Sequence, residues 1–343
     1  MGENSFGGKI LFVVLAFAVV ATLTSEAALM QQVLQPTNEI SLGSSSTGGG
    51  LDSVAGDSGA GAGSTYEAGG PESLAFDGTY IWVTRQFKDA VVRLRANDGT
   101  SVGSIAVGKR PIALVVVGTS VWVANLESDN VMKYRASDGV RLGTYTVGDG
   151  PGGLAYDGTN IWVANRNSHN VTKLRASDGA RLGTYAAGRR PLGLAALGGS
   201  IWVANNKEDT VIKLRASDGM KLGTYKVGDG PFGVASDGAS IWVTNFFGKS
   251  LTKLRATDGV VVGNFGVGHD PAGISFDGKS LWVANSGENT VINVNLDGSI
   301  VATYKTGKSP FSVVFDGANV WSANFGSDTV STSNANAGSI GAQ

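Results

Sequence analysis

The stretch "IWVANRNSHNVTKLRASDGARLGTY", residues 161–185, decides the fold, because it recurs forty residues later as "IWVANNKEDTVIKLRASDGMKLGTY", residues 201–225. The spacing between successive Trp residues of the chain is 40 residues five times and then 39. All seven Trp residues share this register: Trp82, Trp122, Trp162, Trp202, Trp242, Trp282 and Trp321. A period near 40 residues is typical of either paired-helix repeats or four-stranded propeller blades.

The content of one repeat, residues 151–190, chooses between these two architectures. It contains four short strand-like runs, "PGGLAYDG", "NIWVAN", "NVTKLRASDG" and "ARLGTYAAG". Two of them end in Asp-Gly, which is a strong hairpin signal, and none has the 3.6-residue apolar period of a helix. The "IWV" run is apolar on both faces, as expected for a strand packed between two neighbouring blades. The repeat therefore predicts a propeller blade of four antiparallel strands, with its Trp between blades.

The two ends of the repeated region predict how the ring closes. The last repeat begins at Pro310 and lacks the fourth run, whereas "STYEAGGP" before Pro71 resembles "GTYTVGDGP" of a later repeat. We therefore expect Ser64 to Ala68 to supply the missing outer strand of the last blade. The predicted fold is all-β, a seven-bladed β-propeller over residues 64–343, closed by an N-terminal outer strand.

The segment before the repeats predicts export. Residues 10–23 are apolar and are followed by small residues that suit a cleavage site, so residues 1–27 are expected to be a signal peptide or an N-terminal anchor. Residues 28–63 are rich in Gly and Ser and are expected to be a disordered linker. We expect the membrane to be a partner only through an uncleaved N-terminal segment. The predicted location is periplasmic, cell-surface or secreted.

Composition narrows the partners further. The net charge of -1 gives no reason to expect nucleic acid as a partner, and the absence of Cys excludes disulfides and thiolate metal sites. We expect a monomer.

The repeat motifs resemble a known family. "WVAN" or "WVTN", the proline that opens each repeat and "LRASDG" are similar to the YVTN repeats of bacterial and archaeal β-propellers over about residues 64–336. They are more distantly similar to NHL repeats and to streptogramin B lyase. The lyase resemblance implies His directly after the blade proline. Those positions hold Glu72, Ile112, Gly152, Leu192, Phe232, Ala272 and Phe311.

The family comparison therefore favours a non-catalytic binding or scaffolding module over an enzyme. Gluconolactonase-like propellers hold a metal with converging carboxylates, and here Glu72 is the one acidic residue at the start of a first strand. We expect no catalytic residues, no metal and no cofactor. The alternative is a metal-dependent lyase or lactonase that uses the channel mouth, with Glu72 or His269 as the residue to test.

Two polar patterns repeat so regularly that we interpret them as structural. An Asn ends the second strand of six blades, and it is expected to cap the following turn through backbone N–H groups. The third strand carries a Lys or Arg two residues before an Arg, and both cations are expected to pair with the Asp of the next turn.

Function is expected where the repeats differ. The loop into each blade and the loop between its second and third strands share one face of a propeller, around the channel mouth, and there charge and aromatic content vary. A mixed rim of this kind suits a protein, peptide or carbohydrate ligand. The predicted ligand- or partner-binding residues are Arg85, Phe87, Lys109, Arg110, Arg189, Arg190, Phe246, Phe247, His269 and Asp270.

Overall fold

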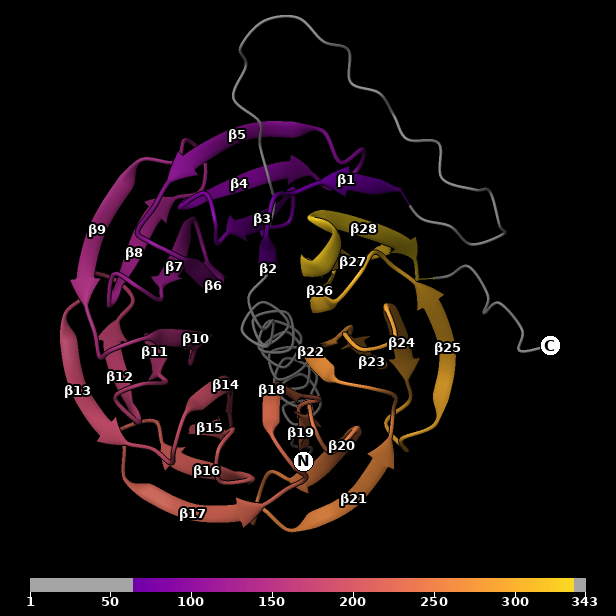
Figure 1. Ribbon diagram of the computed structural model, residues 1–343. Coiled ribbons are helices and arrows are strands. Elements are labelled where there is room, and N and C mark those ends of the chain that lie inside the picture. Colours follow the sequence, from indigo (N-terminus) through magenta and orange to yellow (C-terminus); the bar gives the residue numbers. More distant parts are fainter. Residues whose placement is uncertain (1–63, 336–343) are drawn as a thin grey trace, which may run out of the picture.

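The computed structural model describes residues 64–335, and these form seven four-stranded antiparallel sheets arranged as a ring (Figure 1). Each sheet is one blade, with its first strand beside the central channel and its fourth strand on the outer rim. The fold prediction of a seven-bladed β-propeller is confirmed. The predicted signal peptide (residues 1–27) and linker (residues 28–63) lie outside the described residues.

Every blade follows the same order from the channel outward. The first strands are β2 (Pro71–Phe76), β6 (Pro111–Val117), β10 (Pro151–Tyr156), β14 (Pro191–Leu197), β18 (Pro231–Ser236), β22 (Pro271–Phe276) and β26 (Pro310–Phe315). The second strands are β3 (Tyr80–Arg85), β7 (Ser120–Asn125), β11 (Asn160–Asn165), β15 (Ser200–Asn205), β19 (Ser240–Asn245), β23 (Leu281–Asn285) and β27 (Asn319–Asn324). The third strands are β4 (Ala90–Arg95), β8 (Asn130–Arg135), β12 (Asn170–Arg175), β16 (Thr210–Arg215), β20 (Ser250–Arg255), β24 (Thr290–Val294) and β28 (Thr329–Asn334). The outer strands are β5 (Ser101–Ala106), β9 (Arg141–Thr146), β13 (Arg181–Ala186), β17 (Lys221–Lys226), β21 (Val261–Gly266), β25 (Ile300–Lys305) and β1 (Thr65–Glu67). One short helix, η1 (Phe325–Ser327), joins β27 to β28.

The seven Trp side chains hold the blades together. Each is at most 2% exposed, and six of them stack or tilt against an aromatic ring of their own outer strand, as Trp162 does on Tyr185 with ring centroids 5.5 Å apart. Trp162 shares an apolar cluster with Ile201 and Val203 of the next blade. Burying a side chain of this size stabilises the fold by a few kcal/mol each time. The prediction that Trp packs between blades is confirmed.

The Asp-Gly turn between the first two strands has a second role in five blades. In blade three, Asp157 accepts backbone N–H bonds from Thr159 and Asn160 and an indole N–H bond from Trp162 at 2.7 Å. Blades two and four have Val117 and Leu197 instead of this Asp, and there the indole N–H of the blade Trp has no hydrogen-bond partner among the described residues. The Asp of the turn thus orients the core Trp.

The repeated lysines bind the neighbouring blade, which corrects the sequence interpretation. Lys173 Nζ donates to the carbonyl oxygens of Ala216 and Ser217, which lie one blade further along, at 2.6 and 3.1 Å. It also lies 5.2 Å from the centre of the Trp162 ring. In blades two to five it is the second cation that bonds the Asp of its own turn, as Arg175 does with Asp178 at 2.8 Å. The lysine was assigned to the wrong partner because carbonyls one blade away are invisible in a single repeat.

The ring closes as predicted. Strand β1 pairs antiparallel with β28, with Tyr66 opposite Val330, so the last blade takes its outer strand from the N-terminal side. The Tyr66 ring lies 5.7 Å from the Trp321 ring, which repeats the aromatic pair of the other blades. Closure leaves no open edge between the first and last blades.

A β-bulge opens the first strand of every blade and prepares the functional face. In blade three, Pro151 pairs with Asn165 but Gly153 pairs with Ala164, so residue 152 is the extra residue. The same register shift follows the proline in the other six blades. A bulged residue is released from the alternation of the strand, and its side chain takes a new direction. The residue after each blade proline is therefore displaced from the regular blade packing.

Candidate functional site: the channel mouth

Two sets of loops meet on one face of the ring. The 4–1 loop leads from an outer strand into the next blade, and the 2–3 loop joins the second and third strands. In blade two, Leu126 N–H donates to Arg110 O at 2.9 Å, which joins the two loops. Arg110 has a left-handed φ of 53°, and Asp89 of the previous blade accepts its N–H at 2.9 Å. These contacts confirm that the two loop types share a face.

Two residues of each blade vary at this face although the strands around them repeat. The first is the bulged residue after the blade proline. The second follows the last residue of the second strand, and this set comprises Gln86, Leu126, Arg166, Asn206, Phe246, Ser286 and Phe325. Within a blade the two positions adjoin: a Cβ placed on Gly152 would lie 3.4 Å from Arg166 Cδ. We call these two sets the mouth residues. The bulged set comprises Glu72, Ile112, Gly152, Leu192, Phe232, Ala272 and Phe311.

The mouth residues of blades five and seven form an aromatic cluster. The Phe232 ring lies 5.8 Å from Phe246 and 6.1 Å from Phe311, and Phe311 lies 5.8 Å from Phe325. The rings meet above blade six, whose mouth residues are the small Ala272 and Ser286. All four rings are only partly buried. They offer an apolar surface to a ligand in the mouth.

The aromatic cluster continues onto the loops. Phe247 packs edge-on against Phe246 at 5.3 Å, and Phe87 lies 5.8 Å from Phe325. Both loop rings are largely exposed, at 53% for Phe247 and 64% for Phe87. Phe87 brings the aromatic surface to the edge of blade one, where the charged mouth residues begin.

Glu72 of blade one and Arg166 of blade three are the charged mouth residues, and Arg110 in the loop into blade two adds a third charge near them. Burial raises the pKa of Glu72 to about 7, and the nearby positive charges of Arg110 and Arg166 oppose that rise. Gln86 Nε2 donates a short hydrogen bond to the Glu72 carboxyl. Arg110 Nε in turn donates to Gln86 Oε1 at 3.0 Å, so a hydrogen-bonded chain runs from blade two to Glu72. A carboxyl with this pKa is protonated in about half of the molecules at neutral pH.

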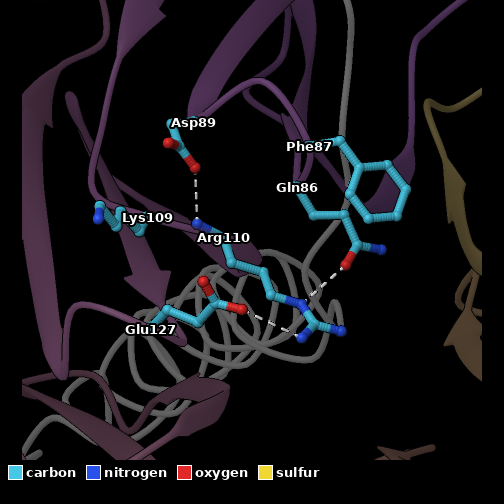
Figure 2. A pocket seen from close by; sticks show the side chains of 6 residues that line it. All are labelled: Gln86, Phe87, Asp89, Lys109, Arg110 and Glu127. Atoms are coloured by element: carbon cyan, nitrogen blue, oxygen red, sulfur yellow. Dashed lines mark hydrogen bonds and ion pairs between the residues drawn. The ribbon is translucent and has the colours of Figure 1, made fainter.

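A pocket lies beside this chain, between the loops of blades one and two (Figure 2). Its volume is about 380 Å³, and its lining residues are Gln86, Phe87, Asp89, Lys109, Arg110 and Glu127. Figure 2 shows the Arg110 guanidinium between Gln86 and Glu127, with Glu127 Oε1 3.3 Å from Arg110 Nη1. The pocket is thus lined by an aromatic ring, a lysine and the Arg110 guanidinium, which already forms an ion pair with Glu127.

The Asn residues that end the second strands have a structural role below the mouth. They are fully buried, and Asn165 Nδ2 donates to Asn170 Oδ1 at 2.7 Å and to Thr172 Oγ1 at 2.9 Å. The expected partners at the exit of the turn are correct in five blades, but the bonds join side chains rather than capping backbone N–H groups. In blade six, Asn285 instead donates to Val267 O at 2.6 Å. In blade four, Asn205 Oδ1 also accepts the Gly188 N–H at 3.0 Å, which belongs to the loop into the blade and not to the turn that follows the Asn.

The residues predicted to bind a ligand fall into three groups. Phe87, Lys109 and Arg110 line the pocket, and Phe246 and Phe247 belong to the aromatic cluster. Four loop residues, Arg189, Arg190, His269 and Asp270, lie on the same face. Lys207 N–H donates to Arg189 O, and Arg190 N–H donates to His169 Nδ1. Ser286 N–H donates to Asp270 O, and Gly287 N–H donates to His269 O. Arg85 ends β3 on the same face, and its Nε donates to Ala68 O at 2.9 Å in the loop into blade one.

Several residues of the mouth were not singled out as binding residues from the sequence. These are Gln86, Phe232 and Phe311, and Glu72 was considered only for the enzyme alternative. They lie inside or directly beside strands, where variation between repeats was given less weight than in the loops. A signal existed: the position after each blade proline and the position after each Asn vary, whereas their neighbours do not.

A cluster of metal ligands or a membrane-spanning helix would each point to a further kind of functional site. Within residues 64–335, no group of three or more His, Asp or Glu side chains is placed to hold a metal ion. In the same range, no helix combines the length and the apolar character needed to cross a membrane.

The fold and the site together define a seven-bladed β-propeller whose channel mouth is aromatic on one side and charged on the other. No protein-family model matches the chain, and no curated protein matches it in sequence. The structure is similar to that of hydrazine synthase from Kuenenia stuttgartiensis, with a TM-score of 0.72 and 18% identity over 84% of this chain and 100% of that chain.

Streptogramin lyase propellers are similarly close. A streptogramin B lyase structure gives a TM-score of 0.68 and 19% identity over 81% of this chain and 99% of that chain. Virginiamycin B lyase from Staphylococcus aureus gives 0.69 and 18% over 79% of this chain and 98% of that chain. At these identities the likeness extends to the fold, and the assignment to YVTN or NHL repeats stays a prediction.

Proposed function

We propose that this protein is an exported β-propeller that acts as a non-catalytic binding module and takes a small organic or peptide ligand at its channel mouth. The observation that carries the proposal is the placement of the variable residues. Residues that repeat hold the blades together, whereas the mouth residues differ from blade to blade and face a common opening. A rigid scaffold that presents a mixed aromatic and charged surface is suited to binding.

Two features of the mouth support binding over a purely structural role. The four partly buried Phe rings keep apolar surface in contact with water, which a ligand that covers them would relieve. The mouth also rests on inner strands in close contact, since a Cβ on Gly193 would lie 2.3 Å from Phe232 O of the next blade. A preformed site loses little conformational entropy when it binds.

A screen of small molecules and short peptides by thermal shift tests the binding proposal. We expect ligands that stabilise the wild-type protein and lose this effect in Phe246→Ala, Phe247→Ala and Arg190→Ala. Val262→Ala, on the outer strand β21, is the matched control and should bind as wild type does. Ligands that stabilise all four variants and the wild type equally would contradict a site at the mouth.

Export is a separate part of the proposal and rests on residues 10–23. Expression of the full chain in a bacterial host, followed by fractionation, tests it. We expect the protein in the periplasm, in the medium or on the outer surface. Recovery of the full-length chain from the cytoplasm alone would contradict export.

A second candidate function, an acid–base enzyme such as a lyase or lactonase, is favoured by Glu72. Its carboxyl lies at the mouth with a pKa of about 7, where a general acid or base is most effective near neutral pH. Mass spectrometry of each screened ligand after incubation separates the two functions. A binding module returns the ligand unchanged, whereas an enzyme returns a product that Glu72→Gln no longer forms.

A further inference from the structure

Arg166 differs from the other arginines of the mouth face because its Nε is buried without a hydrogen-bond partner among the described residues. Arg110 bonds Gln86 and Glu127. The Arg166 guanidinium is partly buried, and its Nε is fully buried without a hydrogen-bond partner. A buried N–H without a partner destabilises the fold, and a charged one does so more strongly.

The position of Arg166 follows from the blade geometry. It follows Asn165, and its aliphatic part lies over the bulged Gly152, the one mouth residue without a side chain. Leu192 of the next blade borders the same spot, with Cδ2 3.7 Å from the place where a Gly152 Cβ would be. A Cβ at position 152 would already be in van der Waals contact with Arg166 Cδ, so the small Gly leaves the space in which the Arg166 side chain lies. The pair of Gly152 and Arg166 therefore places a cation at the opening of the channel.

The charges around Arg166 favour an anion. Burial lowers its pKa, and the positive charges of Arg190 and Arg110 lower it further, while Glu72 and Asp149 act in the opposite direction. An added negative charge would relieve the repulsion among the three arginines. Glu72 supplies that charge only in part, since burial keeps its carboxyl protonated in many molecules at neutral pH. A protonated Glu72 can itself donate a hydrogen bond to an anion.

The rest of the ligand is indicated by the aromatic cluster across the mouth. The mouth is narrow, because the Phe232 and Phe311 rings come from blades two apart and still lie 6.1 Å from each other. Arg166 of blade three, in turn, is close enough to Glu72 of blade one for their charges to interact. A ligand of modest size can therefore contact both sides.

We infer that the channel mouth binds an aromatic carboxylate, with the carboxylate on the Arg166 guanidinium and the aromatic ring on Phe232 and Phe311. This inference rests on the proposed function and specifies its ligand class. The planar guanidinium matches a carboxylate through two parallel hydrogen bonds. The Glu72 carboxyl beside the guanidinium opposes a second negative charge, so one carboxylate suits the site better than the two charges of a phosphate monoester. Ring-on-ring contact supplies the remaining affinity.

Titration calorimetry with naphthylacetate, naphthylacetamide and acetate tests the inference, at pH 6.5 and fixed salt. The wild-type protein should bind naphthylacetate most tightly and acetate most weakly. Arg166→Gln should weaken naphthylacetate at least about tenfold, as expected for loss of a charge-assisted pair, and change naphthylacetamide by less than about twofold. Phe232→Ala should weaken both naphthyl probes to a similar degree. Arg181→Gln removes the same charge from the outer strand β13 and should bind as wild type does.

The outcomes separate this inference from the proposed function. Equal affinity for naphthylacetate and naphthylacetamide, with both lost in Phe232→Ala, overturns the carboxylate site and leaves a neutral ligand site at the mouth. Tighter binding of naphthyl phosphate than of naphthylacetate overturns the choice of a carboxylate. Unchanged naphthylacetate binding in Arg166→Gln overturns the role of Arg166. If no naphthyl probe binds and no ligand of the wider screen depends on the mouth variants, both proposals fail.

Discussion

Glu72 makes a prediction that can be worked through, because its pKa links the mouth to the stability of the protein. Substitution of Glu72 by Gln keeps the size of the side chain and retains an oxygen that can accept the Gln86 hydrogen bond. It removes the one property of interest, the ability to ionise. In the folded protein burial raises the pKa of Glu72 to about 7 from its ordinary value of 4.5.

The sign of the pH effect follows from proton binding. Between pH 4.5 and about 7 the folded protein holds a proton on Glu72 that the unfolded chain has released. The free energy of unfolding contributed by this group is therefore full below pH 4.5 and is lost as the pH rises to about 7. The separation of these two pKa values corresponds to about 3 kcal/mol, at about 1.4 kcal/mol per pKa unit. The Gln variant does not titrate and should not lose this stability.

Thermal melts of the wild type and Glu72→Gln at pH 4.5 and pH 8.5 measure the effect. The variant should melt near the wild type at pH 4.5 and about 6 °C above it at pH 8.5, at about 2 °C per kcal/mol for a domain of this size. Glu127→Gln is the matched control, since the Glu127 side chain is 55% exposed. A difference in melting temperature between Glu72→Gln and wild type that stays constant with pH would refute the reasoning.

Three further predictions concern the scaffold. Tyr66→Ala should lower the free energy of unfolding by about 3 kcal/mol, because Tyr66 packs on Trp321 where the ring closes. The control, Thr65→Ala, should lower it by less than about 1 kcal/mol. Equal melting curves for the two variants would contradict closure by β1. Lys173→Met should lower the free energy of unfolding by about 2 kcal/mol, because two hydrogen bonds to the next blade are lost. Lys221→Met, on the exposed outer strand, should change it little, and denaturant unfolding of the two variants measures the difference. Asp157→Ala should lower the free energy of unfolding by about 2 kcal/mol, because the Trp162 indole N–H loses its acceptor. Val117→Ala is the control, at the same place in a blade whose Trp has no acceptor, and should lower it by less than about 1 kcal/mol. A similar loss in both variants would argue against the role of this Asp.

The architecture was predictable because its determinants lie within one repeat. The strand that carries Trp162 is buried on both faces, and Asp157 with Gly158 marks a tight turn, so one repeat of about forty residues suffices to recognise a blade. The closure by Tyr66 was predictable for the same reason, since the segment "STYEAGGP" copies an outer strand of later repeats. Local sequence and global fold agree throughout, as expected for a repeat protein.

Contacts between blades were harder to predict. Lys173 was expected to bond the Asp of its own turn, but it reaches carbonyls at residues 216 and 217, which no pattern within one repeat reveals. The mouth posed the same problem. Phe232 and Phe311 are 79 residues apart in the sequence and meet only because the ring brings blades five and seven together above the small Ala272. Ring geometry, rather than sequence, determines which variable residues become neighbours.

The closure of the ring also determines how the protein can be displayed. Strand β1 leads into Ala68–Gly70 on the mouth face, and its first residue, Thr65, lies opposite Ser331, partway along β28. Strand β28 begins on the mouth face and runs away from it, so Asn334 lies further from the mouth than the start of β1 does. Both ends of the described chain therefore belong to strands that extend away from the channel mouth. A partner attached in line with either strand would leave the mouth accessible.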